Sequence, residues 1–358
     1  MKAGWEMKRL GDVVQLEYGK PLDRVYRKTD GHFPVYGANG VLSRSDKYYC
    51  DKPGIIVGRK GSAGEINLTE EKFWPLDVTY FVTFDERLYN LTFLYYLLIY
   101  LELPSFAKGV KPGINRNEVY AQDINVPPLP EQQRIVALLD EAFAAIATAK
   151  ANAEKNLKNA RALFDSYLNA VFSRRGDGWV KRTVDELSLN LDSKRIPITK
   201  SDRKSGEYPY YGASGIVDYV ADYIFDGDTL LVSEDGANLL ARSTPIAFSV
   251  SGKYWVNNHA HILKFENMAT QRFVEYYFGS IKIDEYITGA AQPKLNQKAL
   301  NSIPIFIPTS VEKQANIVDS IELLSTETQR LEAIYRQKLV ALDALKKSIL
   351  HQAFTGEL

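Results

Sequence analysis

Two short glycine-containing loops carry polar side chains of the types that bind nucleic acids. Loop A1 is Gly58-Arg-Lys-Gly-Ser-Ala-Gly64, and loop A2 is Ser233-Glu-Asp-Gly-Ala-Asn238. Glycine lets a backbone approach a ligand closely, and Arg, Lys, Asn, Glu and Asp contact phosphates or base edges. We predict a ligand contact in each loop, with ordinary solvated turns as the alternative. The candidate residues are Arg59, Lys60, Ser62, Glu234, Asp235 and Asn238.

A second pair of loops shows the same relation. Loop B1 (residues 108–116) and loop B2 (residues 288–298) align through glycine and asparagine, but their other side chains differ. This pattern predicts two sites of similar shape and different specificity, and acidic residues in the second site would accept a hydrogen bond from cytosine N4. The candidate residues are Lys108, Lys111, Asn115, Arg116, Lys294, Asn296 and Lys298.

Motifs for catalysis are missing from the sequence. It contains neither a phosphate-binding loop ending in Gly-Lys-Ser/Thr nor a His-Glu-x-x-His zinc motif. His259 and His261 are one residue apart, which favours strand positions with one side chain facing inward over a metal-binding pair. We therefore predict no catalytic residues, no metal and no cofactor in this chain.

The four loops belong to an internal repeat. The segment Phe33-Pro-Val-Tyr-Gly-Ala-Asn-Gly40 returns as Tyr208-Pro-Tyr-Tyr-Gly-Ala-Ser-Gly215, and Ile55-Ile-Val57 returns as Leu230-Leu-Val232. A repeat of this kind indicates two copies of one structural unit. The second half is expected to do again what the first half does.

Composition limits the possible classes of protein. The 358 residues are 45% hydrophobic, enough for two ordinary cores, and the 44 basic and 44 acidic residues cancel. Binding to a polyanion must therefore depend on local patches. A single cysteine excludes an internal disulfide, and no apolar run approaches the roughly 20 residues needed to cross a bilayer. We expect a cytoplasmic protein that does not contact membranes.

Each half changes character once, from short strands and turns to a long helix. Proline-rich segments at 127–130 and 304–308 mark the change, and the regions after them lack glycine and proline. The predicted fold is α/β (α+β), with two similar mixed domains joined by two long helices. The predicted domains are 1–130 and 176–310, and the predicted spacer helices are 131–175 and 311–358.

Apolar positions in both long helices follow steps of four and three residues, which is typical of a coiled-coil seam. Because the chain enters each helix from its own domain, paired helices must be antiparallel, and the fold should be pseudo-two-fold and pseudo-circular. Helices packed separately on their own domains are the alternative. The predicted seam runs Ile135, Leu139, Ala142, Ile146, Ala149, Ala153, Asn156, Ala160, Leu163, Tyr167 and Ile317, Ile321, Leu324, Thr328, Leu331, Tyr335, Lys338, Leu342, Leu345, Ile349.

Several motifs resemble the specificity (S) subunit of type I restriction-modification systems, the HsdS family. They are Trp5-Glu-Met-Lys-Arg-Leu-Gly-Asp12, Tyr36-Gly-Ala-Asn-Gly40, Val126-Pro-Pro-Leu-Pro-Glu-Gln-Gln-Arg-Ile-Val136 and Ala353-Phe-Thr-Gly-Glu-Leu358. The resemblance covers nearly the whole chain. The second copy departs from it at Ile307-Pro-Thr-Ser-Val-Glu-Lys-Gln-Ala-Asn-Ile-Val318.

The resemblance implies a non-catalytic DNA-recognition subunit with two target-recognition domains, each reading half of an asymmetric bipartite site in double-stranded DNA. The helices would bind two methyltransferase (M) subunits, and restriction (R) subunits would complete the complex. S-adenosylmethionine, ATP and Mg²⁺ would be used by those partners only. The helical spacer would set the gap: a rod of roughly 65 Å separates the domain centres by at most about 19 base pairs, and the gap should be shorter than that.

Two other functions stay open at this point. One is a non-catalytic, two-headed coiled-coil protein that binds ligands other than nucleic acid. The other is a degenerate DNA methyltransferase, although the Asn/Asp-Pro-Pro-aromatic loop of such enzymes does not occur in the sequence.

Overall fold

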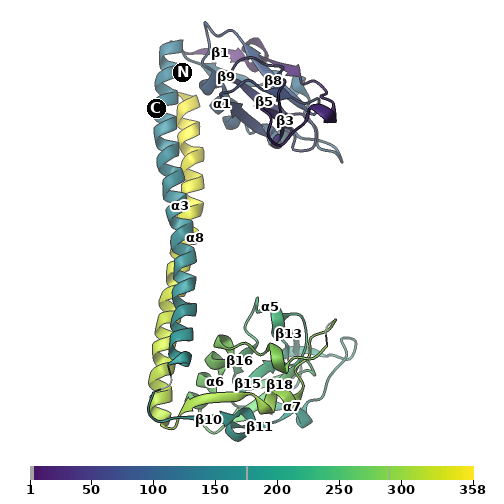
Figure 1. Ribbon diagram of the computed structural model, residues 1–358, viewed down its shortest axis with the longest axis vertical. Coiled ribbons are helices and arrows are strands. Elements are labelled where there is room, and N and C mark those ends of the chain that lie inside the picture. Colours follow the sequence, from purple (N-terminus) through teal and green to yellow (C-terminus); the bar gives the residue numbers. More distant parts are fainter. Residues whose placement is uncertain (1–3, 175, 290) are drawn as a thin grey trace. The chain divides into compact units, whose positions relative to one another are not determined.

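The chain forms two compact units in a computed structural model that describes residues 4–174, 176–289 and 291–358 (Figure 1). Unit 1 comprises the chain up to residue 154 together with 336–358, and unit 2 comprises 155–335. Each unit holds one mixed α/β globule and part of both long helices. The predicted α/β class is confirmed. This division cuts both helices, so the predicted boundaries at 130 and 310 stay predictions.

The globule of unit 1 is built on a four-stranded antiparallel sheet in the order β2-β8-β5-β6. A three-stranded sheet, β4-β3-β7, and the pair β1-β9 complete it. Its elements are β1 (Glu6–Arg9), β2 (Val14–Tyr18), β3 (Phe33–Gly37), β4 (Gly40–Ser45), β5 (Gly54–Gly58), β6 (Ile66–Thr69), β7 (Trp74–Pro75), β8 (Thr79–Phe84), α1 (Leu91–Tyr100), α2 (Arg116–Tyr120) and β9 (Asp123–Val126).

The globule of unit 2 repeats this topology with the sheet β11-β18-β15-β16 and the pair β10-β19. Its second sheet, β13-β12-β17-β14, has one strand more than its counterpart. Its elements are β10 (Trp179–Thr183), α4 (Val184–Leu187), β11 (Ser188–Asn190), β12 (Ser205–Gly212), β13 (Gly215–Val220), β14 (Phe225–Asp226), β15 (Thr229–Ser233), α5 (Asn238–Ala241), β16 (Ala247–Val250), β17 (Lys253–Val256), β18 (Ala260–Phe265), α6 (Met268–Ser280), α7 (Gln297–Ser302) and β19 (Pro304–Pro308).

One long helix begins within the first proline-rich segment, and the other begins just after the second. They are α3 (Leu129–Ser173) and α8 (Val311–Thr355). A buried glutamine fixes each start: Gln132 Nε2 donates to Pro127 O at 2.9 Å, and Gln314 Nε2 donates to Pro308 O at 2.7 Å. The second copy thus keeps this anchor although its motif is degenerate. None of the helices among the described residues is long and apolar enough to cross a membrane.

Within each unit the long helices run antiparallel, as predicted. In unit 1, Lys150 pairs with Asp343 at 2.7 Å while Arg134, nearer the start of α3, donates to Leu358 O at 2.9 Å. In unit 2, Arg161 pairs with Glu332 at 3.1 Å, and the end of α3 packs against the start of α8 in one core.

The predicted seam is wrong at four positions. Asn156, Leu163, Lys338 and Leu345 are exposed. The residues that follow the first three, Leu157, Phe164 and Leu339, are partly buried instead. A straight α-helix has 3.6 residues per turn, so its buried stripe drifts away from a strict seven-residue repeat.

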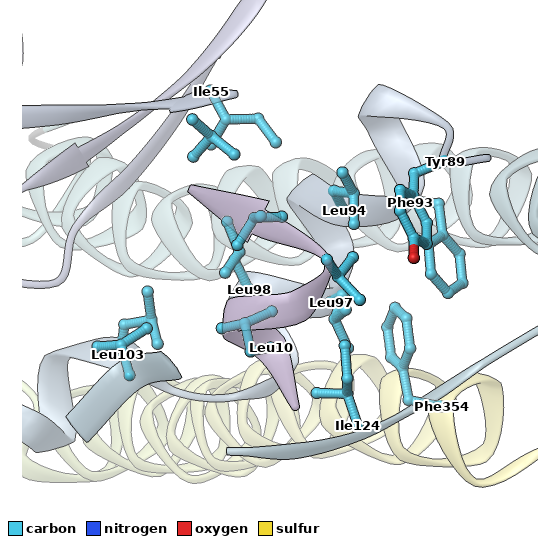
Figure 2. Close-up of a cluster of buried hydrophobic side chains, with 14 of the residues drawn as sticks. Leu10, Ile55, Tyr89, Phe93, Leu94, Leu97, Leu98, Leu103, Ile124 and Phe354 are labelled. Carbon is cyan, nitrogen blue, oxygen red and sulfur yellow. The ribbon is translucent and has the colours of Figure 1, made fainter. Parts of the chain in front are cut away.

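The C-terminal part of α8 returns to the globule of unit 1. Phe354 is buried, with its ring centroid 5.3 Å from that of Phe93 on α1. Figure 2 shows it among the aliphatic side chains of this core, beside Ile124 and Leu97. Trp5 belongs to the same cluster, which confirms the predicted return of the chain to its first domain.

Candidate nucleic-acid interface

Backbone hydrogen bonds join loop A1 to loop B1 in the first globule. Gly61 N donates to Pro112 O at 2.9 Å, and Ile114 N donates to Arg59 O at 3.2 Å. Gly61 has a left-handed φ of 85°, which requires glycine at this turn. Two loops far apart in sequence therefore form one continuous surface.

Loops A2 and B2 make the same pair of bonds in the second globule. Gly236 N donates to Pro293 O at 3.0 Å, and Leu295 N donates to Glu234 O at 2.8 Å. Gly236 also has a left-handed φ, of 104°. The two bonds that join the loops are thus repeated in both globules, while the side chains beside them differ.

The side chains of the first loop pair gather around Tyr18, at the end of β2. The guanidinium carbons of Arg59 and Arg116 lie 5.2 and 5.1 Å from the centre of the Tyr18 ring. The Tyr18 ring in turn lies 5.2 Å from that of Tyr80 on β8. Arg59 also donates twice to Asp77 O, at 3.1 and 2.7 Å. A half-exposed aromatic ring therefore holds two cations in place at the surface.

The other predicted residues of the first globule divide into two groups. Lys108 forms an exposed ion pair with Glu118 at 2.8 Å, and Asn115 caps α2 by accepting from Asn117 N at 2.9 Å. Lys60 and Lys111 are exposed and form no ion pair with another described residue, and Ser62 is half-buried. Lys60, Lys111 and Ser62 are therefore available to contact a ligand.

The corresponding place in the second globule is filled by charged groups instead of an aromatic ring. Strand pairing shows the equivalence, because Val57 lies opposite Tyr80 and Val232 lies opposite His261. Asp192 lies just after β11, in the position beside His261 that Tyr18 occupies beside Tyr80. Asp192 Oδ2 is 2.5 Å from His261 Nδ1. We call Asp192, Arg195, Glu234, His261 and Lys294 the charged cluster.

Glu234 has both carboxylate oxygens engaged in this cluster. Arg195 Nη1 donates to Oε2 at 2.6 Å, and Lys294 Nζ lies 3.2 Å from Oε1. Burial by itself raises the pKa of Glu234, but the hydrogen bond from Arg195 and the nearby positive charges outweigh it and hold the pKa below its usual range. A carboxylate so occupied is poorly placed to accept from a cytosine.

Asp192 behaves in the same way. Burial opposes its ionisation, yet the hydrogen bond and charge of His261 hold its pKa below the usual range, and Ile262 N donates to its Oδ1 at 2.9 Å. The ligand atoms of Asp192, Glu234 and His261 lie within 4.8 Å of one another, a spacing that suits a metal ion. The side chains of Arg195 and Lys294 already neutralise these carboxylates, so we interpret the group as an ion-pair network.

The remaining predicted residues of the second globule have distinct positions. Asn238, the first residue of α5, accepts from Thr244 N at 3.1 Å in the turn that follows this helix, and Asn296 caps α7 as Asn115 caps α2. Asp235 is partly exposed and 2.8 Å from His259 Nδ1. Lys298 is exposed and without an ion pair to another described residue. The predicted inward orientation of one histidine is correct, since His261 on β18 is 1% exposed, but His259 lies in the turn before β18 and not on a strand.

The family model for the type I restriction modification DNA specificity domain matches residues 2–159 and again 176–339. The chain belongs to this family. The two matches coincide with the two copies of the repeat.

Relatives of this specificity-domain protein have names that agree with the family. It is 32% identical over 185 residues to the putative type I restriction enzyme specificity subunit S.HindORF215P of Haemophilus influenzae, covering 47% of this chain and 48% of that protein. The match therefore spans about half of that relative. The EcoDI specificity subunit of Escherichia coli is 23% identical over 411 residues, with 99% of this chain and 88% of that protein covered.

A solved structure shares the fold. It concerns complex assembly and conformational transition of the type I restriction-modification system, and its chain matches at a TM-score of 0.78 with 16% identity. The match covers 100% of this chain and 99% of the other.

The sequence did not reveal three residues that shape the sites of this specificity-domain protein. Tyr18 and Arg195 were not identified, and His261 was expected to face inward but not to belong to the charged cluster. Each lies outside the loop motifs and reaches them through strand pairing or a long-range contact. The repeat offered one usable signal, because Tyr80 and His261 occupy matching strand positions in the two copies.

Proposed function

We propose that this chain is the DNA-recognition subunit of a type I restriction-modification complex, in which each globule reads one half of an asymmetric bipartite site in double-stranded DNA. The observation that carries the proposal is the pair of loop sites with identical backbone bonds and different side chains. A common frame suits a common ligand, the DNA duplex, and different side chains suit different base sequences.

The residues proposed to contact DNA differ in their tasks. Lys60, Lys111 and Lys298 are exposed and would bind phosphates, which gives affinity without base specificity. Arg116, held by Tyr18, can offer the paired donors that read guanine in the major groove, whereas Arg59 already donates from Nε and Nη2 to Asp77 O and has only its remaining N–H groups to offer DNA. In the second globule, Lys294 and Asn296 lie at the exposed edge of the loop pair, and Asp235 is partly exposed beside His259.

The proposal includes partners and excludes catalysis by this chain. Two methyltransferase subunits would bind along the long helices, and restriction subunits would join them, as the family resemblance implies. The names of the relatives and of the solved complex support the coarser point that such subunits assemble into a type I restriction-modification complex. S-adenosylmethionine, ATP and Mg²⁺ would be used by those subunits. The loop sites themselves present donors and acceptors for recognition, with no nucleophile paired to a base among the residues discussed.

Selection from random-sequence DNA tests this function. The chain is assembled with its methyltransferase subunits, and bound duplexes are sequenced. We expect a bipartite sequence with two different halves separated by a gap of fixed length. Enrichment of no sequence contradicts the proposal, and S-adenosylmethionine binding by the chain alone would favour the degenerate methyltransferase.

A length change tests the spacer. Inserting one heptad into α3 and one at the facing position of α8 lengthens the helical pair by about 10 Å, or about three base pairs of DNA. We expect the gap in the selected site to lengthen while both halves stay unchanged. An unchanged gap refutes the role of the helices as a ruler.

A further inference from the structure

His261 is buried beneath loop B2 and both of its ring nitrogens face hydrogen-bond acceptors. Nδ1 lies 2.5 Å from Asp192 Oδ2, and Nε2 lies 2.7 Å from Leu295 O. A carbonyl oxygen has no proton to donate, so Nε2 of His261 carries the proton and donates it to Leu295 O. The contact with Asp192 holds the ring in the orientation that makes this bond.

Leu295 is held on both sides of its peptide backbone. Its N–H donates to Glu234 O at 2.8 Å, and its carbonyl accepts from His261 Nε2. Its side chain is fully buried. Because Lys294 and Asn296 flank it, the direction of these two side chains depends on how Leu295 is fixed.

The first globule fixes its loop differently. Tyr80, which matches His261 in strand position, packs its ring on Tyr18 at 5.2 Å. Ile114, which matches Leu295, has its N–H bound to Arg59 O in the same way as Leu295 to Glu234. The histidine tether is thus a feature of the second site.

We propose that His261 is a positioning residue for DNA recognition: by holding the carbonyl of Leu295, it sets the direction in which Lys294 and Asn296 meet the second half of the bipartite site. The inference rests on the function proposed above. His261 itself does not touch DNA, since its side chain is buried under the loop. Its influence should therefore appear in base preference at one half-site and leave the other half unchanged.

A pair of substitutions separates the two hydrogen bonds of His261. The amide of His261→Gln reaches as far as Nε2 and can still donate to Leu295, whereas the amide of His261→Asn reaches only as far as Nδ1 and can bind Asp192. Tyr80→Phe, at the matching position of the first globule, is the control. Each variant is assembled with its methyltransferase subunits and tested by selection from random-sequence DNA.

We expect His261→Asn to lower discrimination at the second half-site about tenfold, because a buried carbonyl is left without its donor. His261→Gln should keep most of that discrimination, and neither variant should change the first half-site. Tyr80→Phe should leave the second half-site unchanged. Equal behaviour of the Asn and Gln variants, or equal changes at both half-sites, overturns the proposal.

Hydrogen exchange of the Leu295 amide in the full chain without DNA gives an independent measure. Exchange should be faster in His261→Asn than in His261→Gln, and equal rates contradict the tether. If wild-type protein selects no bipartite sequence, the proposed function fails, while the exchange rates still decide whether His261 positions the loop.

Discussion

The two loop sites of this protein are built on the same backbone frame but supported by opposite chemistry. Beneath loops A1 and B1 lies a tyrosine ring that carries Arg59 and Arg116 at the surface. Beneath loops A2 and B2 lies the charged cluster, in which Arg195 and Lys294 bind the carboxylate of Glu234. The first site presents its charges outward, and the second uses most of its charges on itself.

This difference shows how a duplicated recognition domain can diverge without losing its fold. The repeated bonds involve backbone atoms and glycines, so they tolerate any side chain beside them. The supporting residues, by contrast, decide which loop side chains stay free. Base specificity then depends on buried residues as well as on exposed ones, and the comparison can be tested by disturbing each support separately.

The largest effect is expected from Arg195→Met. Its side chain is only 14% exposed and stands between two carboxylates, so its loss leaves buried charge uncompensated and should cost about 3 kcal/mol in the stability of the second globule. Arg59→Met, the control, loses a surface cation–π contact and the hydrogen bonds to Asp77 O, but it leaves no buried charge behind and should cost about 1 kcal/mol. Hydrogen exchange along a denaturant series reports each globule separately, and equal losses would contradict the contrast.

Acid should weaken the second site before the first. The pKa values of Asp192 and Glu234 are lowered in the folded chain, so their ionised forms stabilise the second globule. This stabilisation is fully present above the unfolded pKa values of about 4, and it is lost as the pH falls through the lower pKa values of the folded chain. Tyr18 and Tyr80 bring no carboxylate to the first site, where Glu118 forms only an exposed ion pair with Lys108. Asp46 and Asp85 of the first globule have pKa values of about 2 but lie outside its loops.

Exchange rates of two matched amides measure this difference. After correction for the intrinsic effect of pH, the Leu295 amide should lose protection below about pH 4, while the Ile114 amide keeps it. If both amides lose protection at the same pH, acid acts on the backbone frame that the two sites share. The charged cluster would then not be the cause of acid sensitivity in the second site.

Much of this organisation was predictable from sequence, and the rest depends on register. The repeat and the prolines predicted two mixed domains and two long helices, and the glycines placed all four loops. Tyr18, Arg195 and His261 were not found, because they meet the loops through strand pairing and through contacts between residues 39 or 34 positions apart in sequence. The seam failed at Asn156 and Lys338 because the helical period is longer than a strict heptad.

Removing phosphate-binding charges should have a moderate effect that does not depend on sequence. Lys60→Ala with Lys111→Ala should lower the slope of log K against log salt concentration by about 2 and weaken binding to all duplexes alike. Lys298→Ala in the second globule should lower the same slope by about 1. A change in the selected bases, with the slope unaltered, would mean that these lysines read sequence.

The smallest effect is expected from the support of the first site. Tyr18→Leu removes the ring on which Arg59 and Arg116 rest and should reduce discrimination at the first half-site by about 1 kcal/mol, whereas Tyr18→Phe keeps the ring and should change little. Competition binding with duplexes altered in one half measures both variants. Loss of discrimination in Tyr18→Phe would assign the role to the hydroxyl group, and the two supports would then both act through hydrogen bonds.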